Sequence, residues 1–126
     1  MEFDDLSNRV IGCALEVHRT LGPGLLESAY EQCLFYELSQ AGLAAQCQAD
    51  LPIQYKGVRL ECGYRMDIVV ERQLILELKC VDHLLPIHEA QILTYLKLSG
   101  METGLLMNFN ERYLKDGLRR MVLSKK

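Results

Sequence analysis

The chain has 126 residues, which suits one domain with a single hydrophobic core. Hydrophobic residues make up 49% of the chain and charged residues 25%, a balance that is typical of globular proteins and excludes a disordered chain. The 14 basic and 17 acidic residues give a net charge of −3, which argues against a general nucleic-acid-coating protein and still allows a local basic groove.

The cysteines and the lack of long apolar runs bear on location. Five cysteines form no CxxC pair, and no signal sequence is visible at the N-terminus, so we expect free thiols in the cytoplasm. No apolar run approaches the roughly 20 residues that a membrane span needs. Without repeats or linkers, residues 1–126 are predicted to form one domain that does not enter a membrane.

Two helices are predicted at the start of the chain. Apolar residues recur every three or four positions from Leu6 to Leu21, which is typical of an amphipathic helix, and Gly22-Pro23-Gly24 ends it. A second apolar stripe predicts another helix over residues 26–38, stopping near Gly42.

Strands are predicted in the middle of the chain. The pattern changes after Ala44, and residues 45–55, 58–70 and 74–81 read as three β segments. Lys56-Gly57 supplies the turn between the first two segments, and the sequence ERQ supplies the turn between the second and the third.

The last third of the chain returns to a helical period. Residues 87–98 predict a helix that Gly100 closes, and residues 104–109 predict a further strand. After Leu114, the sequence LRRMVL fits either a short edge strand or a helical turn. This order predicts an α/β fold, an α+β sandwich around a mostly antiparallel or mixed sheet.

Three charged residues interrupt the apolar strands. Glu77 and Lys79 are two apart, so on a strand both point to one face. A three-residue turn at 71–73 places Asp67 directly opposite Glu77, whereas a two-residue turn sends the two carboxylates to opposite faces. We predict the three-residue turn, although it lacks the glycine that such turns favour at their left-handed position.

Two opposed carboxylates imply either a ligand or a counter-ion. Like charges with Cβ atoms about 5 Å apart raise one pKa unless a cation lies between them, and Mg²⁺ suits such a gap. Lys79 could then hold a water molecule or a phosphate oxygen. The alternative is an internal salt bridge of Lys79 with Glu77 or Asp67, and spacing alone does not separate the two.

Polar residues on two helices could border these carboxylates. His88, Gln91 and Tyr95 form one polar stripe, for which the alternative is an ordinary solvated face. Glu27 lies early in the second helix with Tyr30 on the same side, and the alternative for Glu27 is a favourable charge near the helix dipole.

Together these residues resemble a known nuclease pattern. Asp67 followed by Glu77-Leu78-Lys79 is similar to the D…(D/E)xK core of the PD-(D/E)xK nuclease superfamily. The segment GLLESAY at residues 24–30 matches the motif of the GxxExxY family within that superfamily. One departure is Met66, where many members have proline before the aspartate.

The resemblance implies a restriction-endonuclease-like αβββαβ core and specific residue roles. It implies Mg²⁺ or Mn²⁺ held by Asp67, Glu77 and the backbone oxygen of Leu78, with Glu27 completing or supporting the shell. Lys79 would position or activate the attacking water. The substrate-contacting side chains are expected to be Gln91, Tyr95, Tyr30 and His18.

Two functions follow from the resemblance, and a third needs none. The first is a magnesium-dependent nuclease acting on DNA, with RNA less favoured. The second is a catalytically silent nuclease-fold module that binds nucleic acid or a protein partner. The third is a salt-bridge network that only specifies the fold. By analogy with single-domain nucleases we also expect a homodimer. Candidates for phosphate contact are Lys56, Arg59, Arg65, Lys97, Arg112, Lys115, Arg119 and Arg120.

Overall fold

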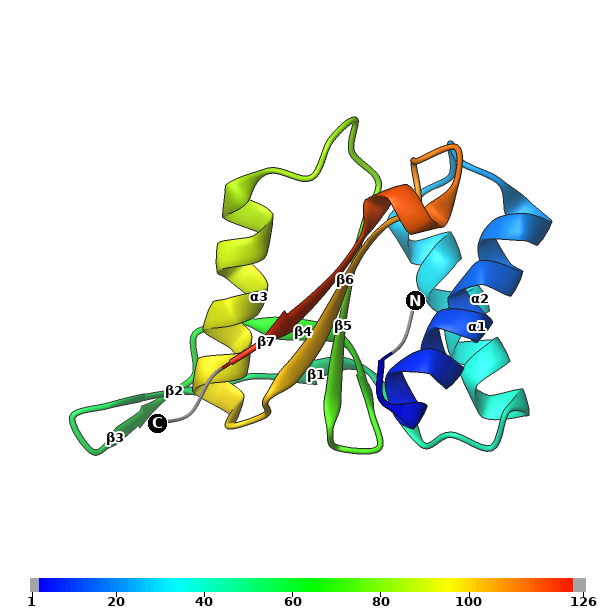
Figure 1. The fold of residues 1–126 in the computed structure, drawn as a ribbon. Coiled ribbons are helices and arrows are strands. Elements are labelled where there is room, and N and C mark those ends of the chain that lie inside the picture. Colours follow the sequence, from blue (N-terminus) through cyan, green and yellow to red (C-terminus); the bar gives the residue numbers. More distant parts are fainter. Residues whose placement is uncertain (1–2, 124–126) are drawn as a thin grey trace.

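The computed structural model describes residues 3–123, which fold around a five-stranded sheet with helices on both faces (Figure 1). Helices α1 (Asp5–Leu21) and α2 (Glu27–Gln40) pack together on one face, and α3 (Pro86–Ser99) covers the other. These are the three helices that the apolar periodicity predicts. The α1 helix begins where the Asp4 side chain accepts a hydrogen bond from the Ser7 backbone N–H at 2.8 Å.

The sheet has the strand order β1-β4-β5-β6-β7. Neighbouring strands are antiparallel except β5 and β6, which run parallel because α3 forms the crossover between them. The predicted α/β class with a mostly antiparallel, mixed sheet is therefore confirmed. The strand bounds are β1 (Ala45–Asp50), β4 (Arg65–Val70), β5 (Leu74–Lys79), β6 (Thr103–Asn108) and β7 (Leu118–Val122).

A separate two-stranded hairpin interrupts the predicted strands. Strand β2 (Ile53–Tyr55) pairs with β3 (Val58–Leu60) around the predicted Lys56-Gly57 turn. The prediction of continuous strands over 45–55 and 58–70 is therefore wrong. Pro52 cannot donate a ladder hydrogen bond, and Gly63 adopts a left-handed φ of 75°, so each strand breaks at the base of the hairpin.

The turn between β4 and β5 has three residues, as predicted. Its register pairs Val70 with Leu74 and Ile68 with Leu76. The left-handed positions are taken by Glu71 (φ 53°) and Arg72 (φ 54°) in place of glycine. The Glu71 backbone N–H donates to the Ala44 carbonyl at 2.8 Å, and its carboxylate accepts from the Ala44 N–H at 2.6 Å. These two bonds offset the strain that a non-glycine residue brings to this conformation.

For the LRRMVL segment the structure decides between the predicted alternatives in favour of the edge strand. A short 3₁₀ turn, η1 (Leu114–Gly117), leads directly into the edge strand β7. The edge strand therefore contains most of the LRRMVL sequence, and its last pairing is Val122 with Thr103.

Candidate active site

The two strand carboxylates meet where the β4–β5 ladder ends. Beyond the Ile68–Leu76 pair, the Asp67 backbone N–H donates to Glu77 Oε1 at 3.3 Å, and the Leu78 N–H donates to Asp67 Oδ2 at 2.9 Å. Side-chain oxygens thus replace ladder carbonyls at this end of the strand pair. The predicted juxtaposition of Asp67 and Glu77 is confirmed.

Glu77 is more deeply buried than Asp67, with 3% of its surface exposed. Burial raises its pKa to about 9, and the neighbouring Asp67 carboxylate adds to that rise. Lys79 and the hydrogen bond from the Asp67 N–H oppose the shift without cancelling it. The surroundings therefore favour a protonated Glu77 beside Asp67. A cation between the two side chains would allow both carboxylates to ionise.

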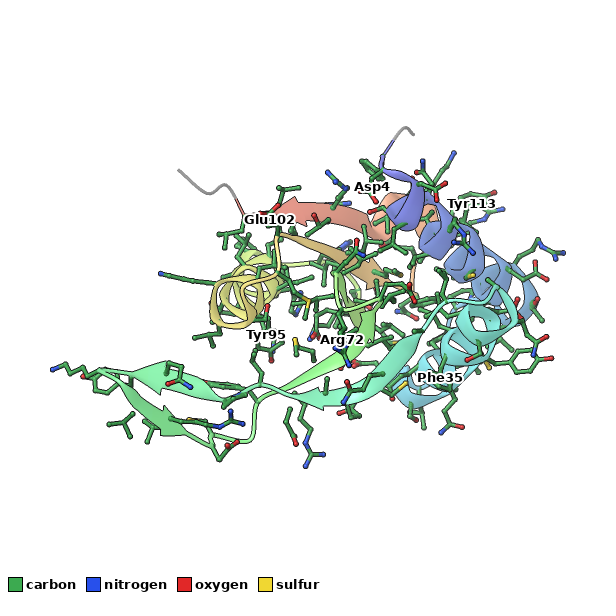
Figure 2. All side chains as sticks on the ribbon, turned by 90° about the horizontal axis from the view of Figure 1, so that it is seen from below. Asp4, Phe35, Arg72, Tyr95, Glu102 and Tyr113 are labelled. Atoms are coloured by element: carbon green, nitrogen blue, oxygen red, sulfur yellow. The ribbon has the colours of Figure 1, made fainter. Side chains whose placement is uncertain are left out.

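Lys79 is held by helix α3 rather than by a carboxylate. Its ammonium donates to Gln91 Oε1 at 3.1 Å, and Gln91 Nε2 donates to the Tyr95 hydroxyl at 3.0 Å. Burial raises the pKa of Tyr95, and the charge of Glu77 adds to that rise. Figure 2 labels Tyr95 on the side of α3 that faces the strands. The expectation that this polar stripe borders the carboxylates is confirmed for Gln91 and Tyr95.

The salt-bridge alternative finds no support in these contacts. Among the ion pairs found within residues 3–123, none includes Lys79, Asp67 or Glu77. They are Arg19–Glu16, Arg59–Glu61, Arg65–Asp50 and Arg120–Asp4.

His88, the first residue of the stripe, has a structural task. Its Nδ1 accepts a hydrogen bond from the Leu85 backbone N–H at 2.9 Å, which closes the first turn of α3. Helix capping explains this histidine, and it does not join the Lys79–Gln91–Tyr95 chain.

Helix α2 presents a second acidic residue that the sequence did not single out. Glu31 lies one turn after Glu27, and burial raises its pKa, with the charges of Asp67 and Glu27 adding to the rise. Gln48 opposes that shift by donating to Glu31 Oε1 at 2.6 Å. The i,i+4 spacing from Glu27 is the signal that could have identified Glu31.

Glu27 itself is exposed at the first residue of α2. Cys80 has a pKa raised to about 11 by burial and then by the charge of Glu27, so this carboxylate lies near the end of β5. Among residues 3–123, however, no three acidic, histidine or cysteine side chains gather closely enough to hold one metal ion. The structure therefore does not bring Glu27 together with Asp67 and Glu77 as a single ligand set.

Strand β1 has an irregularity opposite Asp67. Its ladder with β4 pairs Cys47 with Ile68 and Ala49 with Met66, and it skips the intervening pair. The skipped residue, Gln48, has a left-handed φ of 52° inside a strand. The register is the same on both sides of Gln48, so no residue is inserted, and no sequence signal marked this conformation.

Tyr30 and His18 form hydrogen bonds to loop backbone, not to the carboxylate pair. The fully buried Tyr30 donates to the Gly22 carbonyl at 2.6 Å and accepts from the Leu25 N–H at 3.1 Å. The Nε2 of the buried His18 donates to the Glu111 carbonyl at 2.8 Å. Tyr30 thereby fixes the loop that leads into Glu27.

Asn108 is a buried residue that sequence reasoning missed. It lies beside Lys79 in the parallel β5–β6 register. Its side-chain amide donates to the Val81 carbonyl at 2.8 Å and accepts from the Val81 N–H at 3.1 Å. The amide therefore acts as an extra rung of the ladder and holds the segment that follows Lys79.

The donor set at the carboxylate pair suits a hard divalent cation. Asp67 and Glu77 offer carboxylate oxygens, and Leu78, whose N–H donates to Asp67, adds a backbone carbonyl at the next position of β5. Mg²⁺ prefers oxygen ligands and often takes only one or two protein carboxylates, with water filling the remaining positions. Burial and the charge of Asp67 raise the pKa of Glu77 and so favour its protonated form, whereas such an ion would favour the ionised form.

Comparison with known families is consistent with this arrangement. A family model described as the PD-(D/E)XK nuclease superfamily matches residues 4–121. Neither the curated proteins nor the solved structures give a match. None of the helices within residues 3–123 combines the length and apolar character that a membrane crossing requires.

Proposed function

Because the chain belongs to the PD-(D/E)XK nuclease superfamily, we propose that it is a magnesium-dependent nuclease that hydrolyses phosphodiester bonds of DNA rather than RNA. The observation that carries the proposal is the Asp67–Glu77 pair beside the Lys79–Gln91–Tyr95 chain. The segment GLLESAY further supports placement in the GxxExxY family.

We assign the metal-holding role to Asp67, Glu77 and the backbone oxygen of Leu78. A bound Mg²⁺ or Mn²⁺ supplies Lewis-acid polarisation of the phosphoryl oxygen and lowers the pKa of a bound water. Glu27 and Glu31 on α2 contribute negative potential from the neighbouring helix, which favours cation entry.

Lys79 is the residue that acts on the attacking water or on a phosphate oxygen. Its ammonium is aimed by Gln91, which is in turn held by Tyr95, so the cation has one orientation rather than many. A positive group fixed in advance stabilises developing negative charge without reorganisation during the reaction. Gln91 and Tyr95 are positioning residues in this scheme, and Tyr30 positions the loop before Glu27.

Cleavage of labelled DNA and RNA, in single- and double-stranded forms, tests the proposal. We expect cleavage with Mg²⁺ or Mn²⁺, none with a chelator, and loss of cleavage in Glu77→Ala and Lys79→Ala. The matched controls are Glu16→Gln and Arg19→Met on α1, whose side chains are 42% and 74% exposed. Equal cleavage by Glu77→Ala and the unaltered protein would overturn the site. Binding without turnover under every metal would favour the catalytically silent module.

A further inference from the structure

The β2–β3 hairpin projects from the body of the protein, and we call residues 53–60 the hairpin arm. Figures 1 and 2 both show β3 on the outer side of the arm, with β2 between β3 and α3. Its large side chains are open to solvent: Tyr55 is 57% exposed, Val58 56% and Leu60 42%. Isolated two-stranded hairpins are marginally stable in water, so an arm that exposes these side chains would gain stability from a partner.

The arm has one apolar face. Its register pairs Ile53 with Leu60 and Tyr55 with Val58, and directly opposed residues share a face. Arg59 lies on the opposite face, across from Gln54. The apolar face therefore consists of three exposed residues, Tyr55, Val58 and Leu60, together with the half-buried Ile53.

Among residues 3–123, nothing pairs with the outer edge of β3, and its free backbone groups lie at defined positions. The two-residue turn makes Tyr55 and Val58 a hydrogen-bonded pair. Because bonded and non-bonded positions alternate along β3, Val58 and Leu60 bond to β2 and Arg59 does not. The N–H and C=O groups of Arg59 consequently point outward. Glu61 follows β3 directly and has the same parity as Arg59, so its backbone groups point outward as well.

We propose that the β3 edge pairs antiparallel with the β3 edge of a second copy of this chain, with the two-fold axis at Leu60. In this register Arg59 opposes Glu61 of the second copy, and the reciprocal pair forms by symmetry. Both pairs use the outward backbone groups, while the two Leu60 side chains meet at a non-hydrogen-bonded position.

Charge selects this register over its neighbours. An axis at Arg59 would oppose two arginines, and an axis at Glu61 would oppose two glutamates; like charges directly opposite are destabilising. Within one chain, Arg59 and Glu61 already pair at 2.8 Å, and their side chains are 62% and 66% exposed. They therefore remain accessible to a second copy, and the dimer joins both pairs into one four-charge cluster.

The expected dimer is weak and depends on protein concentration. One short strand pair lies at the low end of specific interface sizes, so dissociation in the micromolar range or above is expected. The inference does not rest on nuclease activity, because no residue of the carboxylate site takes part.

Charge reversal tests the register. By analytical ultracentrifugation over a range of concentrations, we expect the unaltered protein to dimerise and both Arg59→Glu and Glu61→Arg to stay monomeric. The double variant R59E/E61R should regain the dimer. Far-UV circular dichroism checks that each variant folds, and Arg19→Glu is the control on exposed α1 surface.

Disulfide trapping tests the axis. In a Cys62→Ser background, oxidised Leu60→Cys should give a covalent dimer, whereas Arg59→Cys should not, because Arg59 faces Glu61 rather than itself. The proposal is overturned if the unaltered protein is a monomer at every concentration, or if R59E/E61R fails to restore the dimer. Equal disulfide trapping at Leu60→Cys and Arg59→Cys also overturns it. If the unaltered protein is itself monomeric and Arg59→Glu loses nucleic-acid binding, the arm is assigned to nucleic acid and the proposal is overturned.

Discussion

The backbone N–H of Leu78 donates a hydrogen bond to Oδ2 of Asp67 at 2.9 Å. This bond gives one carboxylate two tasks, because Asp67 satisfies a buried strand donor and also contributes to the charged pair with Glu77. Its structural and chemical roles can be separated by substitution.

Asp67→Asn should keep the fold and lose function. The asparagine retains an oxygen acceptor for the Leu78 N–H, whereas Asp67→Ala leaves that buried donor unsatisfied, at a cost of about 1–3 kcal/mol in the free energy of unfolding. Urea denaturation in a chelating buffer measures the difference. Both variants should fail to cleave nucleic acid. Equal destabilisation by Asn and Ala would contradict the structural role of this bond.

Removing Glu77 should flatten the pH dependence of stability in the metal-free protein. Its pKa is about 9 in the folded state and 4.5 when unperturbed, so between these values the folded state holds an extra proton. The free energy of unfolding therefore falls as pH rises through this window. Glu77→Gln should remove that part of the slope and stabilise the protein at pH 8. Glu16→Gln is the control and should leave the slope intact, and a slope unchanged in Glu77→Gln counts against the raised pKa.

Cation binding should release a proton near neutral pH. Because the pKa of Glu77 lies at about 9, an ion that binds its carboxylate must displace the proton held there. Calorimetric titration with Mg²⁺ in Tris and in Pipes measures the proton release. The two binding enthalpies should differ by the difference between the ionisation enthalpies of the buffers, multiplied by on the order of one proton. Mg²⁺ should also raise the melting temperature. Neither effect should appear in Glu77→Gln, and identical enthalpies in the two buffers would sink the idea.

Gln91→Ala should lower turnover without weakening cation binding. It frees the Lys79 ammonium from its 3.1 Å bond, and misplacement of a catalytic group by about 1 Å can cost on the order of 100-fold in rate. Tyr95→Phe removes only the support behind Gln91 and should cost less. Steady-state kinetics and Mg²⁺ calorimetry on the same samples measure both quantities. A parallel loss of Mg²⁺ affinity would show that Gln91 does more than orient Lys79.

Tyr30→Phe tests the loop before Glu27. The substitution keeps the ring stacked on Phe109 and removes two hydrogen bonds, to Gly22 and Leu25, at about 1 kcal/mol each in the free energy of unfolding. Hydrogen exchange should increase locally over residues 22–26. Unchanged exchange there, with lost cleavage, would point to direct substrate contact by Tyr30 instead.

Strand parity explains why much of the site could be predicted. Once the turn after Val70 has three residues, the positions of Asp67 and Glu77 follow from the alternation of side chains along paired strands. The polar stripe on α3 was predictable for a different reason. The helix follows β5 in the chain and must pack on its sheet.

The missed features depend on contacts between distant segments. Asn108 reads as an ordinary strand residue until the parallel register places it near Val81. Gln48 adopts a left-handed conformation that its residue type does not favour, and its bond to Glu31 forms only once β1 and α2 meet. Pro52 and Gly63 are both residues that can interrupt a strand. The alternation of apolar and polar residues nevertheless continues through each position, so it predicts continuous strands.

The parallel pairing of β5 with β6 also constrains the order in which the site can form. Lys79 ends β5, whereas Gln91 lies within the crossover helix α3, which packs against β6 as well as β5. Asp67 and Glu77, by contrast, are brought together by a short local turn. During folding the carboxylate pair can therefore assemble first, and the ammonium becomes oriented only after the longer-range docking step is complete.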